Sequence, residues 1–212
     1  MGNEFQIMMA NPHGQVQLES SFCHELQKLI SENNFKTIVE IGTWKGMGST
    51  YCILQGIGNS NVNFISLESF KEFHDIAKNN LRNYLHKVKL LYGRIIEVEE
   101  FLDFNKNLFD EFRNDQKNWF KNDVDTYKKC ENVLESIPNK IDLLVLDGGE
   151  FSTYLEWLKL KDRTQYIVLD DTKCLKTKRI TEECLKDPKY KLIISSEERN
   201  GFHIFEKIDE IS

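Results

Sequence analysis

The sequence has no long apolar run and no pair of closely spaced cysteines, and each absence excludes a class of protein. No segment approaches the roughly 18 consecutive apolar residues that a membrane-spanning helix needs, so we expect no membrane partner. The N-terminus lacks a basic start followed by an apolar stretch, and we therefore expect no secretory signal peptide.

The cysteines are odd in number, and no two of them have the C-x-x-C spacing of many zinc and redox sites. This pattern favours reduced cysteines and a cytoplasmic protein, and it does not favour a structural zinc site. The cysteines are Cys23, Cys52, Cys130, Cys174 and Cys184.

An excess of basic residues is also missing, because the formal net charge is −6. A nucleic-acid partner would require a concentrated basic face, so we expect none. The sequence has only 3 prolines among 212 residues, and no repeats or Pro/Gly-rich linkers mark a boundary. We therefore expect a single domain over residues 1–212, and a homo-oligomer remains open.

Apolar strands and amphipathic helices alternate along the chain. A helix is predicted over 19–33, and the Asn200-Gly201 pair predicts a terminal hairpin. Strands that are apolar on both faces and alternate with helices favour an α/β fold with a covered parallel sheet. We expect a doubly wound, Rossmann-like, seven-stranded sheet, mostly parallel with an antiparallel last strand. Its strands are predicted at 37–42, 61–69, 88–95, 141–149, 165–171, 190–197 and 201–208.

Residues 96–138 do not fit this alternation, because the segment is long, polar and charged. Aromatic and leucine side chains nevertheless recur at helical spacing between Phe101 and Phe112, which predicts a helical insertion. Packing of this aromatic stripe onto the sheet is the simpler interpretation, and a lid or a partner surface is the alternative.

Polar residues collect where the predicted strands end. In doubly wound sheets, ligands bind beyond the carboxyl ends of the strands, so these side chains predict one shared site. His13 lies in an N-terminal segment that could fold over it. The residues at the strand ends are Glu40 with the glycines that follow it, Glu68, Gly93 with Arg94, Asp147, and Asp170 with Asp171.

The turn after the first strand, "VEIGTWKGMGS", contains Gly42, Gly46 and Gly48. These positions do not match the G-x-G-x-x-G spacing of dinucleotide-binding turns. Glu40 places a negative charge beside the turn, which would repel a pyrophosphate and suit a ligand with an amino group. Glu68 ends the second strand at the position where a carboxylate binds ribose hydroxyls in nucleotide sites.

The turn resembles motif I of class I S-adenosylmethionine-dependent methyltransferases, which has an acid followed by Gly-x-x-x-Gly. Further segments are similar to this family in the same order, and together they cover about residues 20–208 except 96–138. These segments are "FISLE", "LYGRI", "IDLLVLDGGEFSTY", "YIVLDDT" and "NGFHIF". The resemblance implies a methyltransferase fold and S-adenosylmethionine as the methyl donor.

The resemblance also implies roles for individual residues. Glu40 would lie near the amino group of the cofactor, and Glu68, with Ser69 beside it, would hold the ribose. Gly93 and Arg94 would flank the adenine, and Asp147 would also lie at the cofactor. The methionine part would be lined by Gly42, Thr43, Gly46 and Ser49, with Trp44 as a pocket wall.

A subgroup of the family has DGxH after the fourth strand and DD or DN after the fifth, and it uses Mg²⁺. This chain has Glu150 where that subgroup has histidine, so Glu150 would serve as base or ligand. Asp147, Asp170 and Asp171 would bind the metal, and Asp147, Glu150 and Asp170 are the candidate catalytic residues. Alternatively, Asp147 only contacts cofactor or substrate, while Asp170 and Asp171 cap the next helix.

The sequence thus predicts methyl transfer to a hydroxyl of a small molecule, with a sugar or glycan precursor as one candidate. Three alternatives stay open. They are an NAD(P)-dependent oxidoreductase, a metal-dependent hydroxylase on the same fold, and a non-catalytic binding protein.

Overall fold

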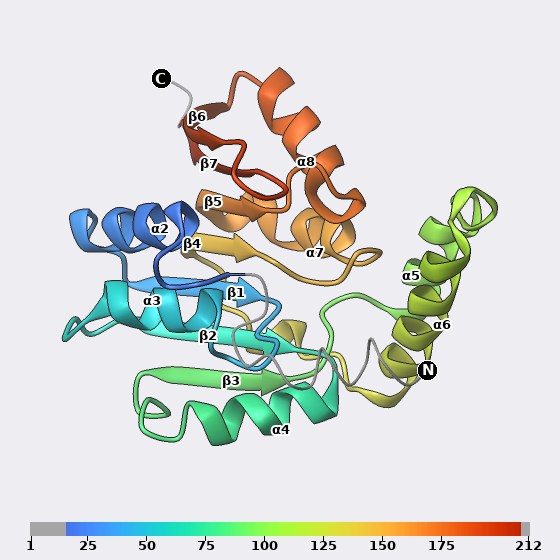
Figure 1. Cartoon of the computed structure of the whole chain (residues 1–212), viewed down its shortest axis with the longest axis horizontal. Helices are drawn as coiled ribbons and strands as arrows, with labels where there is room; N and C mark the ends of the chain where they lie inside the picture. Colours follow the sequence, from blue (N-terminus) through green and yellow to red (C-terminus); the bar gives the residue numbers. More distant parts are fainter. Residues whose placement is uncertain (1–15, 209–212) are drawn as a thin grey trace.

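A seven-stranded sheet forms the centre of the molecule, in a computed structural model that describes residues 16–208. The strand order is β3-β2-β1-β4-β5-β7-β6 (Figure 1). His13 lies outside the described residues. The strands are β1 (Thr37–Ile41), β2 (Asn63–Glu68), β3 (Val88–Tyr92), β4 (Ile141–Leu146), β5 (Thr164–Asp170), β6 (Tyr190–Ser196) and β7 (Phe202–Lys207).

Strands β1 to β5 pair in parallel, and β7 pairs antiparallel with both β5 and β6. The expected mostly parallel sheet with an antiparallel last strand is confirmed. Arg199 and Gly201, at the predicted hairpin, have φ angles of 55° and 82°. Such left-handed residues let the chain reverse tightly between β6 and β7.

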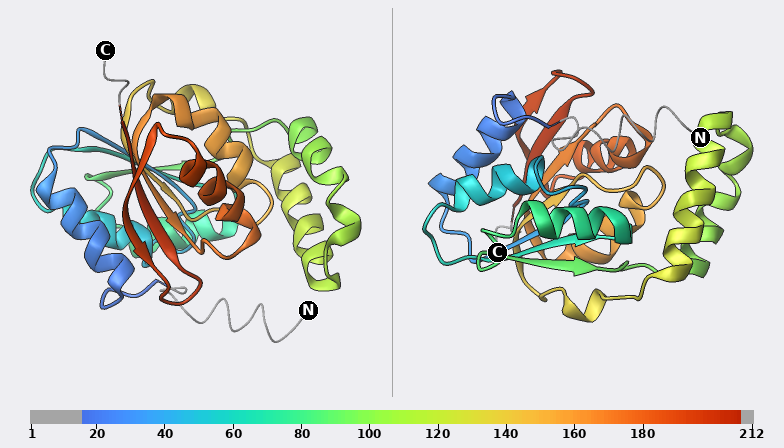
Figure 2. Two further views of the ribbon diagram at one scale, coloured as in Figure 1. Left: turned by 90° about the horizontal axis from the view of Figure 1, so that it is seen from above. Right: turned by 60° about the horizontal axis from the view of Figure 1, so that its bottom comes forward.

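Helices cover both faces of the sheet (Figure 2). Helix α2 begins after Ser20, whose side chain accepts a hydrogen bond from the Cys23 amide and so satisfies a free backbone donor. The helices are α2 (Ser21–Glu32), α3 (Ser49–Ile57), α4 (Lys71–Asn80), α5 (Val98–Lys106), α6 (Asn114–Lys129), α7 (Thr153–Leu160) and α8 (Leu175–Lys186), with 3₁₀ turns at Phe109–Glu111, Leu134–Ser136 and Lys161–Arg163.

Two apolar clusters fill the space between the helices and the sheet. Leu26 of α2 and Ile53 of α3 pack with Ile38 on one face. Trp157 of α7 and Ile180 of α8 pack on the other face. These side chains are almost wholly buried, and their removal from water is the main favourable contribution to folding.

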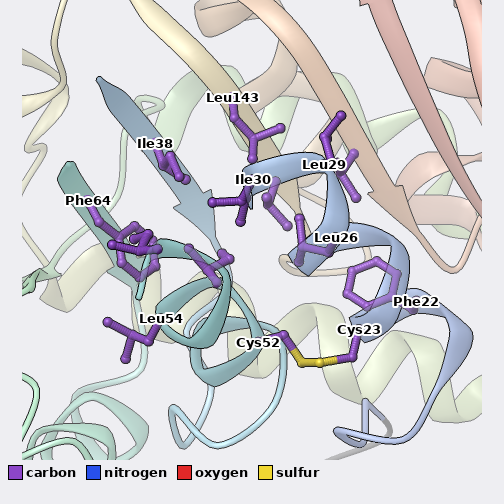
Figure 3. Packing of buried hydrophobic residues seen from close by; sticks show 14 of the residues in the cluster. Phe22, Cys23, Leu26, Leu29, Ile30, Ile38, Cys52, Leu54, Phe64 and Leu143 are labelled. Carbon is purple, nitrogen blue, oxygen red and sulfur yellow. A yellow bond between two sulfur atoms is a disulfide. The ribbon is translucent and has the colours of Figure 1, made fainter. Parts of the chain in front are cut away.

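A disulfide joins Cys23 of α2 to Cys52 of α3 (Figure 3). The sequence-based expectation that all cysteines are reduced is therefore wrong for this pair. The two residues are 29 positions apart, and only the packing of α2 beside α3 brings their Cα atoms to 5.4 Å. The remaining cysteines, Cys130, Cys174 and Cys184, are free.

Residues 96–138 contain the helix pair α5 and α6, which lies beyond the carboxyl ends of the strands (Figures 1 and 2). Phe101, Phe112 and Phe120 form a third cluster with Phe151 and Leu155, at the start of α7. The aromatic stripe thus packs within the helix pair and against α7, and not mainly on the sheet as the simpler interpretation had it.

Between residues 16 and 208, none of the helices combines the length and the apolar character needed to cross a membrane.

Candidate active site

The strand ends that the sequence singled out lie side by side in the structure. The neighbouring strands β3, β2, β1, β4 and β5 are parallel, so their carboxyl ends share one edge of the sheet. The turn after β1 is bound to β2, because the amides of Gly42 and Thr43 donate to the carbonyl of Leu67. The amide of Asp147 donates to the carbonyl of Ile41, which joins the end of β4 to β1.

Two glycines of the turn, Gly42 and Gly46, are required by the protein's own packing. Gly42 has a φ angle of 101°, and a Cβ there would lie 2.2 Å from the carbonyl oxygen of Asp147. Gly46 has a φ of 79°, and its Cβ would meet the side chain of Leu81 at 2.7 Å. Both positions need glycine for backbone conformation and for close approach of protein atoms. The need for glycine therefore does not itself indicate a ligand.

Glu40 is fully buried in a network of hydroxyl groups. One of its carboxylate oxygens, Oε2, accepts from Thr50 at 2.6 Å and from Ser66 at 2.5 Å. Thr43 bonds to Ser66 at 2.6 Å, which extends the network into the turn. Burial raises the pKa of Glu40 to about 7, although the bonds from Ser66 and Thr50 oppose this.

The second oxygen of Glu40, Oε1, is buried and has no hydrogen-bond partner among the described residues. A buried acceptor without a donor costs free energy, so such an atom is expected to have a partner in the working state. Ser49, at the start of α3, lies near this carboxylate, and its hydroxyl is 3.5 Å from Oδ2 of Asp147. The orphaned oxygen fits a ligand that carries an amino group.

Glu68 binds the backbone of both neighbouring turns. Its Oε2 accepts from the amide of Trp44 at 2.8 Å, and its Oε1 accepts from the amide of Phe70 at 2.8 Å. Each carboxylate oxygen can accept a further bond, so the group retains capacity for ribose hydroxyls. Burial raises the pKa of Glu68 to about 7. Ser69 follows Glu68 directly, and its amide also bonds to this carboxylate.

Trp44 occupies the left-handed region with a φ of 52°, and its ring packs on Phe73 with centroids 3.9 Å apart. Its indole nitrogen is buried and has no partner among the described residues. A bulky residue in this conformation is strained, and such residues cluster at functional sites. This supports the prediction that Trp44 forms part of a pocket wall.

Gly93 and Arg94, predicted to flank adenine, anchor the helix pair in this structure. The guanidinium of Arg94 donates to the carbonyls of Tyr127 and Ile96, at 3.0 and 2.9 Å. A Cβ at Gly93 would lie 2.8 Å from the carbonyl oxygen of Glu131. The end of β3 is thus tied to both ends of the α5–α6 segment.

Asp147, Asp170 and Asp171 come together, with one oxygen from each lying within 4.8 Å of the others. Two cations lie among them. Lys176 places its Nζ 2.7 Å from Asp147 and 2.8 Å from Asp171. Arg199 lies 2.7 Å from Asp170 and 3.3 Å from Asp171. The carboxylates that would bind Mg²⁺ therefore already have counter-ions, and this set does not fit a divalent metal as it stands.

Glu150 lies beside this cluster and accepts a hydrogen bond from the amide of Leu175 at 3.1 Å. It therefore binds the first amide of α8, where a negative charge is favoured. Desolvation raises the pKa of Glu150, and Lys176 opposes this shift. A carboxylate with a raised pKa is a better proton acceptor near neutral pH, which suits the predicted role as base.

The sequence did not indicate Lys176 or Arg199 as site residues. Lys176 lies in the first turn of α8, and Arg199 belongs to the terminal hairpin, 28 positions after Asp171. The available signal for Lys176 was a basic residue five positions after the acid pair Asp170-Asp171. No local signal marked Arg199, because only the pairing of β7 with β5 brings the hairpin to the site.

A second acidic group lies between the helix pair and α7. Glu156 is buried and accepts from the hydroxyl of Tyr127 at 2.9 Å. Asp123 of α6 has a pKa raised to about 8 by desolvation and by the charge of Glu156. These side chains join the helix pair to the core of the domain, and the sequence did not single them out.

Two surface hollows of about 440 and 650 Å³ lie elsewhere. Their linings include Lys161 and Tyr190 for one, and Pro138 and Arg163 for the other. These residues flank the amino ends of β4, β5 and β6, on the edge opposite to the carboxylates. In doubly wound sheets the carboxyl edge binds the ligand, so neither hollow is the candidate site.

This sheet order with its single antiparallel strand is that of the class I methyltransferase fold. The structure is similar to an O-methyltransferase from Bacillus cereus in complex with SAH, with a TM-score of 0.61 and 14% identity over 97% of this chain and 88% of that one. No protein-family model matches the sequence, and no curated protein matches it.

Two further solved structures share the fold. The O-methyltransferase TomG from Streptomyces achromogenes, involved in tomaymycin synthesis and bound to SAM, has a TM-score of 0.59 and 14% identity over 92% of this chain and 83% of that one. The SAH-bound methyltransferase PaMTH1 from Podospora anserina has a TM-score of 0.55 and 12% identity over 98% of this chain and 97% of that one. At these identities the likeness establishes the fold.

Proposed function

We propose that this protein transfers a methyl group from S-adenosylmethionine to a hydroxyl of a small molecule. The observation that carries the proposal is the orphaned oxygen of Glu40, at the glycine turn of a methyltransferase fold. The amino group of the cofactor is the donor that this oxygen lacks. O-methyltransferases with this fold contain SAM or SAH, which supports the same cofactor here.

The residues at the carboxyl edge suit the parts of this cofactor. Glu40 would accept from the amino group, and the hydroxyl of Ser49 would lie at the methionine part beside Gly42, Thr43 and Gly46. Glu68, with Ser69 beside it, would bind the ribose through its remaining acceptor capacity. Bound S-adenosylmethionine supplies a methyl group on a sulfonium, so the protein has mainly to align the acceptor oxygen with it.

Glu150 would accept the proton of the acceptor hydroxyl, because its pKa is raised and it lies near Asp171 and Lys176. Asp147 and Asp170 are held by Lys176 and Arg199, and we assign them to orientation of the acceptor. A sugar or glycan precursor is a suitable first class of acceptor to test, since it offers many hydroxyls. The helix pair α5–α6 stands at this edge and would border the acceptor (Figure 1).

Titration calorimetry with S-adenosylhomocysteine and with NAD⁺ tests the cofactor. We expect binding of S-adenosylhomocysteine alone, because the turn lacks the spacing for a pyrophosphate and Glu40 would repel one. Binding of NAD⁺ alone would instead establish an oxidoreductase.

Transfer of a labelled methyl group to a panel of sugars, glycan precursors and phenols tests the reaction. Labelled product identifies the acceptor. If the protein binds the cofactor and methylates no compound of the panel, but oxidises one of them, a hydroxylase would be favoured. Cofactor binding with no turnover of any kind would favour a non-catalytic binding protein.

A further inference from the structure

The side chain of Lys176 is the least expected feature of the acidic edge. It is nearly buried, with only 8% of the residue exposed. Its ammonium bridges the ends of two strands, because it contacts Asp147 after β4 and Asp171 after β5. The ammonium thus uses oxygens of two of the three carboxylates that the sequence assigned to a metal.

The backbone around Lys176 holds this side chain over the strand ends. Asp171 has a φ of 56°, which turns the chain sharply from β5 into α8. The hydroxyl of Thr177 donates to the carbonyls of Asp170 and Asp171, at 2.8 and 2.9 Å. The amide of Leu175 is bound by Glu150. The first turn of α8 is therefore fixed against the acids, and the position of Lys176 follows from it.

Arg199 supplies a second cation to the three carboxylates. It reaches Asp170 and Asp171 from the hairpin turn, where Asn200 also donates to Asp171 at 3.0 Å. The hairpin is held there by the amide of Thr172, which donates to the carbonyl of Gly201. Three carboxylates therefore face two permanent cations, and a divalent ion would make the group net positive.

We propose that Lys176 is a built-in cation that takes the place of a divalent metal at this edge, so that the protein works without one. A metal ion would need oxygens of these three carboxylates at about 2.0–2.6 Å, and the two cations already contact one oxygen of Asp147, one of Asp170 and both of Asp171. It would have to displace the ammonium and leave a buried lysine without a counter-ion, which is strongly unfavourable. Lys176 is then a positioning residue that holds Asp147 and Asp171. This part of the proposal rests on the proposed methyl transfer.

The protonation of Lys176 agrees with this role. Burial by itself would lower the pKa of the amine, but Asp147 and Asp171 raise it well above its ordinary value. The side chain therefore stays charged and does not act as a base. An ammonium has three donors, and the two carboxylates use two of them, so a third can meet an oxygen of the acceptor.

Manganese binding, followed by electron paramagnetic resonance, tests the inference without any activity. We expect the wild-type protein to bind no Mn²⁺ at this edge. The Lys176→Met variant keeps the apolar length of the side chain but frees the carboxylates, and we expect it to bind one ion. Lys173→Met is the matched control, because Lys173 pairs with the exposed Glu197 outside the cluster and its loss should create no site.

One bound Mn²⁺ in the wild type that is lost in Asp147→Asn would overturn the proposal. A folded Lys176→Met protein that binds no ion would also overturn it, since the lysine would not be what excludes the metal. If Lys176→Met does not fold, Lys176→Gln and the wild-type measurement decide the question in the same way.

The second measurement is the initial rate of methyl transfer with added EDTA or added Mg²⁺. We expect the wild-type rate to change by less than about two-fold in either case. Complete loss of activity in EDTA, restored by Mg²⁺, would overturn the proposal. If the proposed function itself is wrong, no methyl is transferred under any condition, while Mn²⁺ binding still reports on Lys176.

Discussion

The carboxylates Glu40, Glu68 and Glu156 are all buried, and the pKa of each is raised to about 7. Their partners differ, and the difference separates their roles. Both oxygens of Glu68 and both of Glu156 accept bonds from protein groups. Of these three carboxylates, only that of Glu40 keeps a buried oxygen without a donor among the described residues. The proposed contact of Glu40 with the cofactor amino group rests on this unsatisfied acceptor, whereas the proposed contact of Glu68 with ribose rests on its remaining acceptor capacity.

Replacement of Glu40 by glutamine should weaken binding of S-adenosylhomocysteine about 10- to 100-fold, since a hydrogen bond to a charged group contributes roughly 1.5–3 kcal/mol. The amide keeps the shape of the side chain and one acceptor, but it loses the negative charge. Titration calorimetry measures the change. 5′-Methylthioadenosine lacks the amino-acid part and should bind both proteins equally, so an equal loss for both ligands would refute the role of Glu40.

Glu156 makes stability depend on pH in a predictable direction. Burial raises its pKa from 4.5 to about 7, so the folded protein binds its proton more tightly than the unfolded chain does. This stabilisation is present below pH 4.5 and is lost as pH rises through 7. Between pH 4.5 and pH 7, the unfolding free energy of Glu156→Gln should therefore fall by about 3 kcal/mol less than that of the wild type.

Urea unfolding at a series of pH values measures this difference. Glu182→Gln is the control, because Glu182 is exposed on α8 and should leave the pH profile unchanged. If Glu156→Gln and the wild type lose stability in parallel between pH 5 and pH 7, Glu156 is ionised in the folded protein.

The helix pair α5–α6 has a small core of its own, separate from the two clusters that cover the sheet. Phe101 lies at its centre, stacked on Tyr127 with centroids 4.8 Å apart and 5.3 Å from the ring of Phe120. The pair also contacts the start of α7 through Phe151. Such an arrangement allows this segment to unfold locally while the sheet remains folded.

Phe101→Ala should therefore destabilise the helix pair by about 3–5 kcal/mol, the usual cost of removing a buried aromatic ring. We expect amides of 98–129 to lose protection from hydrogen exchange, while amides of β1 and β4 keep theirs. Leu102→Ala is the matched control, because Leu102 lies next to Phe101 on the same helix but is 36% exposed. Uniform loss of protection over the sheet would show that the pair and the sheet unfold together.

The disulfide between Cys23 and Cys52 ties α2 to α3, two of the helices that pack on one face of the sheet. Both residues are almost completely buried, so a reductant should reach the bond only when this region opens. The bond also removes the cysteine argument for a cytoplasmic protein, since that argument assumed reduced thiols.

The double variant Cys23→Ala, Cys52→Ala should lose about 3–4 kcal/mol of unfolding free energy, because its unfolded chain is no longer cross-linked over 29 positions. Guanidinium unfolding with and without dithiothreitol measures this. We expect the reductant to destabilise the wild type and to leave the double variant unchanged. Cys130→Ala controls for the loss of a buried side chain, and it should stay sensitive to dithiothreitol.

The fold was predictable from the sequence because its signals are local. Apolar runs such as 141–146 specify buried strands, and Asn200-Gly201 specifies a hairpin. The meeting of Glu40, Glu68, Asp147, Asp170 and Asp171 at one edge also followed, since parallel strands bring their carboxyl ends together. The succession of strands along the chain and the residue types at their ends were sufficient for these predictions.

Only the tertiary structure decided which groups these acids face. Lys176, Arg199 and the partner cysteines Cys23 and Cys52 are brought to their contacts by helix packing and by the β5–β7 pairing. The direction of a side chain depends on neighbours that are distant in the sequence, so no local pattern specifies it. The sequence alone therefore determined a methyltransferase-like sheet with an acidic edge. The packing of α8 and the hairpin against that edge decided that Asp147, Asp170 and Asp171 pair with a lysine and an arginine.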